Sequence, residues 1–189
     1  MTLLIRVSKQ VQRKFFQNPF SSESSALRKG PESREILAVV HGHVEVRHNF
    51  ISEEEENVLF KEDDVKTEKC VLRVRAVAFP KDSPLLGPVH VLDLDKDGYI
   101  KPHIDSVKVC ERINPASSLL SDIVMRLVPK NKSTDWVDLL LSRRSLYILR
   151  DDARFKFTHE ILKDEESFFS GQNVPRHRRI SVICPNLPV

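Results

Sequence analysis

The sequence predicts a mainly β protein with flanking helices, built as a sandwich, barrel or jelly roll. From Val89 onward, short apolar runs alternate with turn residues, which is typical of many short strands. Before that point, two segments carry helix signals instead. The chain has 189 residues, of which 40% are hydrophobic and 30% charged, and this is enough for one substantial core.

The first 35 residues have the composition of a targeting segment and a linker. Residues 1–30 hold six Lys and Arg side chains against one acid, Glu23, together with apolar residues and serines. A basic, acid-poor and amphipathic segment is typical of a mitochondrial transit peptide, and the alternative interpretation is a disordered basic tail. We expect residues 1–35 to be a transit peptide and linker, and residues 36–189 to be a domain in the mitochondrial matrix.

Two helices and a strand are expected before residue 80. A short strand is predicted over Val44–Arg47. Ser52 and Glu55 have capping-box spacing, so a helix should begin there, with the acidic run Glu53–Glu56 as its solvated first turn. A second helix is expected from Val65 to Phe79, where a proline-containing segment ends it.

The remaining elements are expected to be strands, each an apolar run bounded by turn residues. The predicted strands are Val89–Leu94, Ile104–Cys110, Ile123–Val128, Trp136–Leu141, Leu146–Leu149, Arg154–Ile161 and Arg179–Cys184. The basic cluster Arg176–Arg178 precedes the last strand, and we interpret it as a solvated loop.

Composition disfavours several classes of protein. The net charge of +3 is uneven, because acids slightly outnumber bases outside residues 1–30, and this argues against a broad nucleic-acid footprint. No apolar run approaches the roughly 20 residues of a membrane-spanning helix. Cys70, Cys110 and Cys184 form no Cys-x-x-Cys pair, so we expect reduced thiols in a reducing compartment.

Three side chains have the spacing of a metal-binding triad. His103 and Asp105 lie two residues apart and would face the same way on one strand, and His159 follows on a later predicted strand. Two imidazoles and one carboxylate leave positions open on an octahedral ion, as in non-haem Fe(II) oxygenases. Arg179 suits the distal carboxylate of a keto acid, because a guanidinium binds two oxygens at once.

The segment before the triad permits a second interpretation. Asp93–Ile100 matches the opening of an EF-hand calcium loop, with Gly98 at its sixth position. The twelfth position is Ile104, however, where the loop needs a bidentate glutamate, and Pro102 interrupts the exiting helix. We therefore favour a tight acidic hairpin turn that leads into the triad.

Several longer stretches of the sequence resemble one family. They are His90–Leu94, Gly98–Ser106, Ser118–Ser121, Val124–Leu127, Ser145–Arg150, His159–Phe169 and Arg178–Cys184. Over about residues 44–188, the chain resembles the mitochondrial branch of the AlkB family of Fe(II)/2-oxoglutarate dioxygenases. The resemblance implies a double-stranded β-helix, or jelly roll, with helices that support the major sheet.

The resemblance also implies a reaction and the residues that support it. The residues implied to bind Fe(II) are His103, Asp105 and His159, with no further catalytic residue. Those implied to bind 2-oxoglutarate are Tyr147, Arg179, Ile180 and Ser181. O2 would be the second cosubstrate, and the substrate would be a protein or an RNA. This branch of the family is associated with programmed necrosis and fatty-acid metabolism.

Two departures from the family pattern leave an alternative open. The family places a second arginine six residues after the first, and this chain has Pro185 there, which supplies neither charge nor donor. The chain also passes from Leu59 directly to Phe60 and Lys61, where the family has further secondary structure, so the domain is shortened near residue 60. The alternative is a weak or inactive jelly-roll pseudoenzyme that acts as a binding protein.

Overall fold

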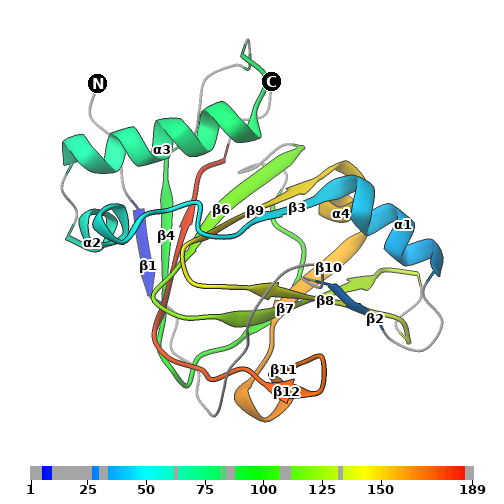
Figure 1. The fold of residues 1–189 in the computed structure, drawn as a ribbon. Coiled ribbons are helices and arrows are strands. Elements are labelled where there is room, and N and C mark those ends of the chain that lie inside the picture. Colours follow the sequence, from blue (N-terminus) through cyan, green and yellow to red (C-terminus); the bar gives the residue numbers. More distant parts are fainter. Residues whose placement is uncertain are drawn as a thin grey trace.

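Two β-sheets that face each other form the body of the protein (Figure 1). The structure is a computed structural model, and it describes residues 6–9, 27–29, 34–61, 64–81, 83, 88–106, 112–131 and 134–185. The larger sheet has six strands in the order β1-β4-β13-β6-β9-β3, and the smaller has five in the order β2-β8-β7-β10-β5. Strands distant in sequence are neighbours in both sheets, which is the arrangement of a jelly roll. The predicted fold class is confirmed.

Each sheet combines strands from the whole described chain. The larger consists of β1 (Arg6–Lys9), β4 (His90–Leu94), β13 (Arg179–Ile183), β6 (Ile113–Leu119), β9 (Ser145–Arg150) and β3 (Val44–Arg47). The smaller consists of β2 (Leu27–Lys29), β8 (Val137–Leu141), β7 (Ile123–Pro129), β10 (Phe157–Ile161) and β5 (Ile100–His103). A separate hairpin joins β11 (Phe168–Phe169) to β12 (Gln172–Asn173). All described pairings are antiparallel except that of β1 with β4.

The helices lie outside the sheets. They are α1 (Arg34–His43), α2 (Glu53–Lys61), α3 (Asp64–Ala78), α4 (Asp151–Phe155) and the 3-10 turn η1 (Asp164–Glu166). The predicted capping box is present, because Ser52 N–H donates to Glu55 Oε2 at 2.8 Å and Glu55 N–H donates to Ser52 Oγ at 3.1 Å. None of the described helices is long and apolar enough to cross a membrane.

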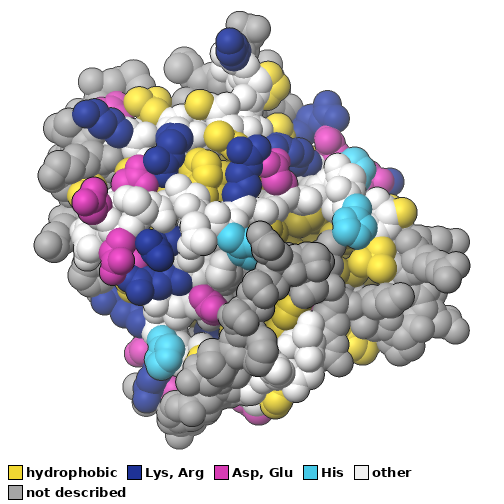
Figure 2. Space-filling view, in the orientation of Figure 1, with side chains coloured by type: hydrophobic (Ala, Val, Ile, Leu, Met, Phe, Trp, Pro, Cys, Tyr) yellow, Lys and Arg dark blue, Asp and Glu magenta, His cyan; other side chains and the backbone are white. Residues whose placement is uncertain are grey.

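The first turn of α2 differs from the expectation that it is solvated throughout. Glu56 is 2% exposed, and it accepts hydrogen bonds from the Leu120 backbone N–H at 2.8 Å and from the Arg143 guanidinium. It therefore attaches α2 to the strand ends beside it. Glu53, Glu54, Lys69 and Arg73 of α2 and α3 are exposed, whereas Glu55, Glu68 and Arg75 are half-buried. Figure 2 shows basic and acidic side chains intermingled on this side of the molecule.

Two apolar layers and a smaller cluster, which consists of Val124, Leu162, Phe169 and Val174, hold the fold together. The first fills the space between the sheets, with side chains such as Met125, Leu139 and Leu149. The second lies between the outer face of the larger sheet and α3; its main members are Ile51, Val71, Val74, Phe79, Leu146, Ile148, Ile180 and Val182. The larger sheet therefore has one face toward the smaller sheet and one toward α3.

Two strand predictions differ from the structure. Within the predicted strand Ile104–Cys110, residues 104–106 are not in a strand and residues 107–110 lie outside the described part; β5 lies just before them, at residues 100–103. The predicted strand Arg154–Ile161 begins only at Phe157, because α4 contains Arg154. Asp151 has a φ of 40°, and the helical turn that it starts carries the chain from β9 to β10.

Other elements had no clear signal in the sequence. β6 contains Pro115, Ala116 and two serines, which are poor strand formers, and its place inside the larger sheet sets its conformation. β1 and β2 lie within residues 1–35, where we expected a transit peptide and linker. The expected hairpin between β4 and β5 is a crossover instead, because these strands belong to different sheets.

Candidate functional site

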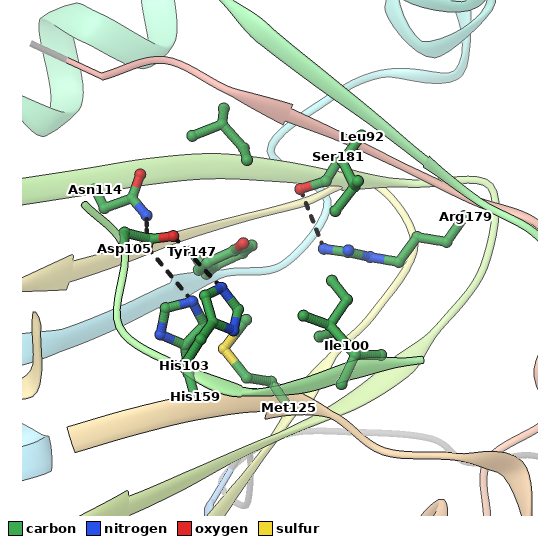
Figure 3. Close-up of a pocket in the computed structure, with 12 residues that line it drawn as sticks. Leu92, Ile100, His103, Asp105, Asn114, Met125, Tyr147, His159, Arg179 and Ser181 are labelled. Carbon is green, nitrogen blue, oxygen red and sulfur yellow. Dashed lines mark hydrogen bonds and ion pairs between the residues drawn. The ribbon is translucent and has the colours of Figure 1, made fainter. Parts of the chain in front are cut away.

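A pocket between the sheets brings most of the predicted site residues together. The larger sheet contributes Tyr147 from β9 and Arg179 and Ser181 from β13. The opposite wall holds His103 at the end of β5, and His159 in β10 (Figure 3). Asp105 lines the same pocket, so the three expected metal ligands and three of the four expected cosubstrate residues meet there.

The triad is compact enough to hold one ion. One ligand atom from each of His103, Asp105 and His159 lies within 4.8 Å of the other two, and no comparable group occurs elsewhere in the described residues. Asp105 Oδ1 is 3.6 Å from His103 Nε2, and Asp105 Oδ2 is 3.4 Å from His159 Nε2. The acidic residues before β5, which suggested a calcium loop, do not form such a group.

The backbone assembles the triad differently from the expected His-x-Asp strand. His103 and His159 are directly opposite each other in the antiparallel pair of β5 and β10, and their ring centroids are 4.3 Å apart. Asp105 lies beyond the end of β5, so the expectation that His103 and Asp105 share a strand is wrong. Cross-strand pairing places the imidazoles, and the chain leaving β5 supplies the carboxylate.

Two neighbours orient these ligands. Asn114 Nδ2 donates a hydrogen bond to Asp105 Oδ2 at 2.5 Å. His103 Nδ1 lies 2.9 Å from the carbonyl oxygen of Lys101, which fits a ring with its proton on Nδ1. Nε2 of His103 lies on the pocket side of the ring, 3.6 Å from Asp105 Oδ1. Such outer partners fix a ligand's orientation and its tautomer.

The electrostatics favour an ionised Asp105 and a neutral His159. Burial alone would raise the pKa of Asp105, but the hydrogen bond from His103 and the charges of His159, His103 and Arg154 lower it to about 2. Burial lowers the pKa of His159 to about 4. The hydrogen bond with Asp105 raises the pKa of His103, against the effect of burial. At neutral pH the carboxylate is therefore charged and His159 keeps its lone pair.

Arg179 forms a second polar centre in the pocket. Arg179 is 1% exposed. Its Nε donates a hydrogen bond to Ser118 Oγ at 2.9 Å, and its Nη2 donates one to Ser181 Oγ at 3.3 Å. Burial lowers its pKa, an effect partly offset by a hydrogen bond with Tyr147. None of the ion pairs among the described residues includes Arg179. A buried guanidinium that contacts hydroxyls and no carboxylate is suited to an anionic ligand.

Two residues singled out from the sequence lie away from the pocket lining. Ile180 points to the opposite face of the sheet, where it packs against α3 in the outer apolar layer. Pro185 is buried and lies two residues beyond the end of β13, which ends at Ile183 and not at Cys184. Ile183 is the last residue of β13 that lines the pocket.

Some pocket residues were missed, and one basic residue was misinterpreted. Asn114 had no signal, because Asn-Pro is typical of a turn and here it lies within β6. Leu92, Ile100 and Met125 have side chains that are common in any core, so nothing marked them as pocket residues. Arg176 was expected in a solvated loop, yet it is 2% exposed.

Curated relatives agree with the resemblance found in the sequence. The mitochondrial alpha-ketoglutarate-dependent dioxygenase alkB homolog 7 of Mus musculus is 60% identical over 116 residues, which are 61% of this chain and 52% of that protein. Its counterpart in Bos taurus is 57% identical over 116 residues, with the same coverage. The chain therefore spans about half the length of the curated relatives it matches.

Other comparisons add little. No family model matches the chain. Among solved structures, a prolyl-4-hydroxylase from Pseudomonas putida overlaps 83% of this chain and 94% of its own, with 11% identity and a TM-score of 0.44. The sequence similarity to the mammalian relatives confirms that the chain resembles AlkB-type dioxygenases.

Proposed function

We propose that this chain is an Fe(II)- and 2-oxoglutarate-dependent dioxygenase of AlkB type. The observation that carries the proposal is that the triad and the buried Arg179 open into one pocket. A divalent ion site alone would serve many functions. A cation site that shares a pocket with a buried guanidinium suits a ligand that binds metal at one end and carries a carboxylate at the other.

The donor set fits Fe(II). One ionised carboxylate and two imidazoles are hard and intermediate ligands, and together they leave coordination positions for other groups. His103, Asp105 and His159 would hold the ion. Because the pKa of His159 is about 4, this ring loses no proton when it binds a metal at neutral pH.

The opposite end of the pocket fits the distal carboxylate of 2-oxoglutarate. Arg179 would provide the charge, and the hydroxyls of Tyr147 and Ser181, which already surround the guanidinium, would donate further hydrogen bonds. Ile180 lies between Arg179 and Ser181 on β13 with its side chain packed toward α3, so its part in this site would be to hold its two neighbours in place from the other face of the sheet. When bound, Fe(II) and 2-oxoglutarate supply oxidation of a substrate C–H bond by O2, with release of succinate and carbon dioxide.

The chain itself would orient these groups and limit the access of water. Asn114 fixes the carboxylate of Asp105 through its hydrogen bond. The side chains of Leu92, Ile100 and Met125 line the pocket around its two polar centres with apolar surface (Figure 3). An apolar wall strengthens electrostatic contacts with bound anions, because it lowers the local dielectric constant.

The substrate and the cellular role follow from resemblance alone. We propose a protein or an RNA as substrate, and a mitochondrial location in the matrix after removal of a transit peptide within residues 1–35; the mammalian relatives are named mitochondrial. The association of this branch with programmed necrosis and fatty-acid metabolism is carried over in the same way.

One alternative has a specific observation in its favour. A jelly-roll pseudoenzyme would keep the pocket and use it for binding, and Pro185 at the usual position of a second arginine supports this reading. Pseudoenzyme and enzyme differ in turnover and not in metal binding, so they can be separated by experiment.

The test is oxygen-dependent conversion of 2-oxoglutarate to succinate by the purified, Fe(II)-loaded chain without added substrate. We expect slow succinate formation by the parent chain in air and none under nitrogen. We also expect none in Arg179→Gln, a variant that keeps the three residues of the triad. Metal and 2-oxoglutarate binding without succinate would favour the pseudoenzyme. Failure to bind a divalent ion would overturn both interpretations.

A further inference from the structure

A buried arginine outside the pocket links the two strands that carry the histidines. Arg176 lies in the segment between β12 and β13 (Figure 1) and is 2% exposed. Its guanidinium donates one hydrogen bond to the Leu162 carbonyl and another, 2.5 Å long, to the Gly98 carbonyl. Leu162 directly follows β10, and Gly98 precedes β5 by two residues. One side chain thus joins the end of β10 to the start of β5.

β5 depends on such links because it is an edge strand. β10 is its one partner within the described sheet. The pairing matches His103 with His159 and Ile100 with Ile161, but the register shifts between these two points. None of the four residues of β5 is fully buried, and register is specified weakly where neither face of a strand is buried. The separation of the two imidazoles nevertheless depends on that register.

The turn that Arg176 holds is itself firmly packed. The Gly98 N–H donates to the Asp95 carbonyl at 2.8 Å, and a Cβ on Gly98 would lie 2.6 Å from the Leu94 side chain. A second link runs beside the first, because Lys163 Nζ lies 5.5 Å from the centroid of the Tyr99 ring. Hydrogen bonding of Arg176 to Gly98 therefore also restricts the position of β5, which begins two residues later.

The arginine keeps its charge despite its burial. Burial and the charge of Arg179 lower the pKa of Arg176 to about 10, and the nearby Asp164 opposes this. A charged donor forms stronger hydrogen bonds to carbonyls than a neutral one does. Loss of the guanidinium would leave two carbonyls of the β5 and β10 segments without these donors, which costs free energy in a buried setting.

We propose that Arg176 is a positioning residue of the metal site, which holds β5 in register with β10 and so sets the separation of His103 and His159. The inference rests on one part of the proposed function, namely that the triad binds a metal ion. Arg176 does not line the pocket, so it acts through the backbone and not through contact with the ion.

Three variants test this role. Arg176→Gln removes the charge and the forked guanidinium that reaches both carbonyls. Arg176→Lys keeps the charge but replaces the fork with a single ammonium group. Arg178→Gln is the matched control: its arginine lies two residues away, has 48% of its side chain exposed and pairs with Asp93. We expect the Mn(II) dissociation constant to rise about ten- to hundredfold in Arg176→Gln, less in Arg176→Lys, and not in the control.

Amide hydrogen exchange of the metal-free protein provides a second readout. We expect faster exchange in residues 98–106 and 157–163 of Arg176→Gln, with α3 unchanged. If the parent binds no Mn(II), the proposed function fails, while the exchange pattern still decides the role of Arg176. The proposal would be overturned if exchange in both segments of Arg176→Gln were unchanged, or if exchange in α3 were accelerated equally. It would also be overturned if Arg176→Gln bound Mn(II) with the dissociation constant of the parent.

Discussion

The two faces of the six-stranded sheet have opposite chemistry, although the same strands build both. On β13, Arg179, Ser181 and Ile183 face the pocket, whereas Ile180 and Val182 pack toward α3. The inner face holds buried charge and hydroxyls around a space for ligands. The outer face is an apolar layer whose buried groups need no ligand.

On this strand, the side chains that line the pocket alternate with those that stabilise the fold. Side chains at i and i+2 share a face, so a change at one position reaches the site, and a change at the next reaches the core. We therefore expect the two faces to respond separately to substitution. The following variants test how complete this separation is.

The largest effect is expected at the inner face, in Asp105→Ala. The substitution deletes the one anionic ligand of the triad, so the metal dissociation constant should rise roughly a thousandfold, which is about 4 kcal/mol. Calorimetry with Mn(II) and iron analysis would measure it. Asp95→Ala, in the exposed turn before β5, is the matched control and should bind metal normally. Unchanged iron content in Asp105→Ala would refute the assignment of the triad.

The next effect is expected at the outer face, in Ile180→Ala. Ile180 is 6% exposed within the layer against α3, so its truncation should lower the free energy of unfolding by about 3 kcal/mol. Urea denaturation would measure the loss, and Ile180→Val should cost about 1 kcal/mol. Metal affinity of the folded variant should equal that of the parent. A tenfold loss of affinity would show that the faces are coupled.

A smaller effect is expected at Glu56, the buried carboxylate that attaches α2 to the strand ends. Glu56→Gln weakens the hydrogen bonds to the Leu120 N–H and the Arg143 guanidinium, so the free energy of unfolding should fall by about 1–3 kcal/mol. Glu54→Gln, on the exposed side of the same helix, should have no measurable effect. Equal stability of both variants would mean that Glu56 does not anchor α2.

The smallest effect is expected from Pro185→Arg. An added guanidinium beyond Ile183 would supply a second charge to the cosubstrate, but it must fit where a buried proline lies. Binding of 2-oxoglutarate should therefore tighten by about tenfold at most, or about 1.4 kcal/mol. Calorimetry with Mn(II) would measure it, and Pro185→Ala separates loss of the ring from gain of charge. An unchanged dissociation constant in a folded variant would show that residue 185 does not reach the cosubstrate.

The sequence predicted which residues meet in the pocket better than how the backbone brings them together. Residue type and order singled out His103, Asp105 and His159, and their side chains do lie together. Their arrangement depends on the pairing of β5 with β10, and long-range pairing has no local signal. Arg176 illustrates the limit most clearly. Its surroundings in sequence are basic and polar, so only the fold reveals that it is buried.

Strand β13 also constrains how the molecule can fold. It lies between β4 and β6, whose residues precede it by tens of positions in the chain. Loop closure over such separations slows folding, so the six-stranded sheet is expected to complete late. Until residues 179–183 have left the ribosome, the strands on either side remain unpaired edges. The pocket lining and the outer apolar layer are then expected to be completed in the same step, since β13 contributes side chains to both.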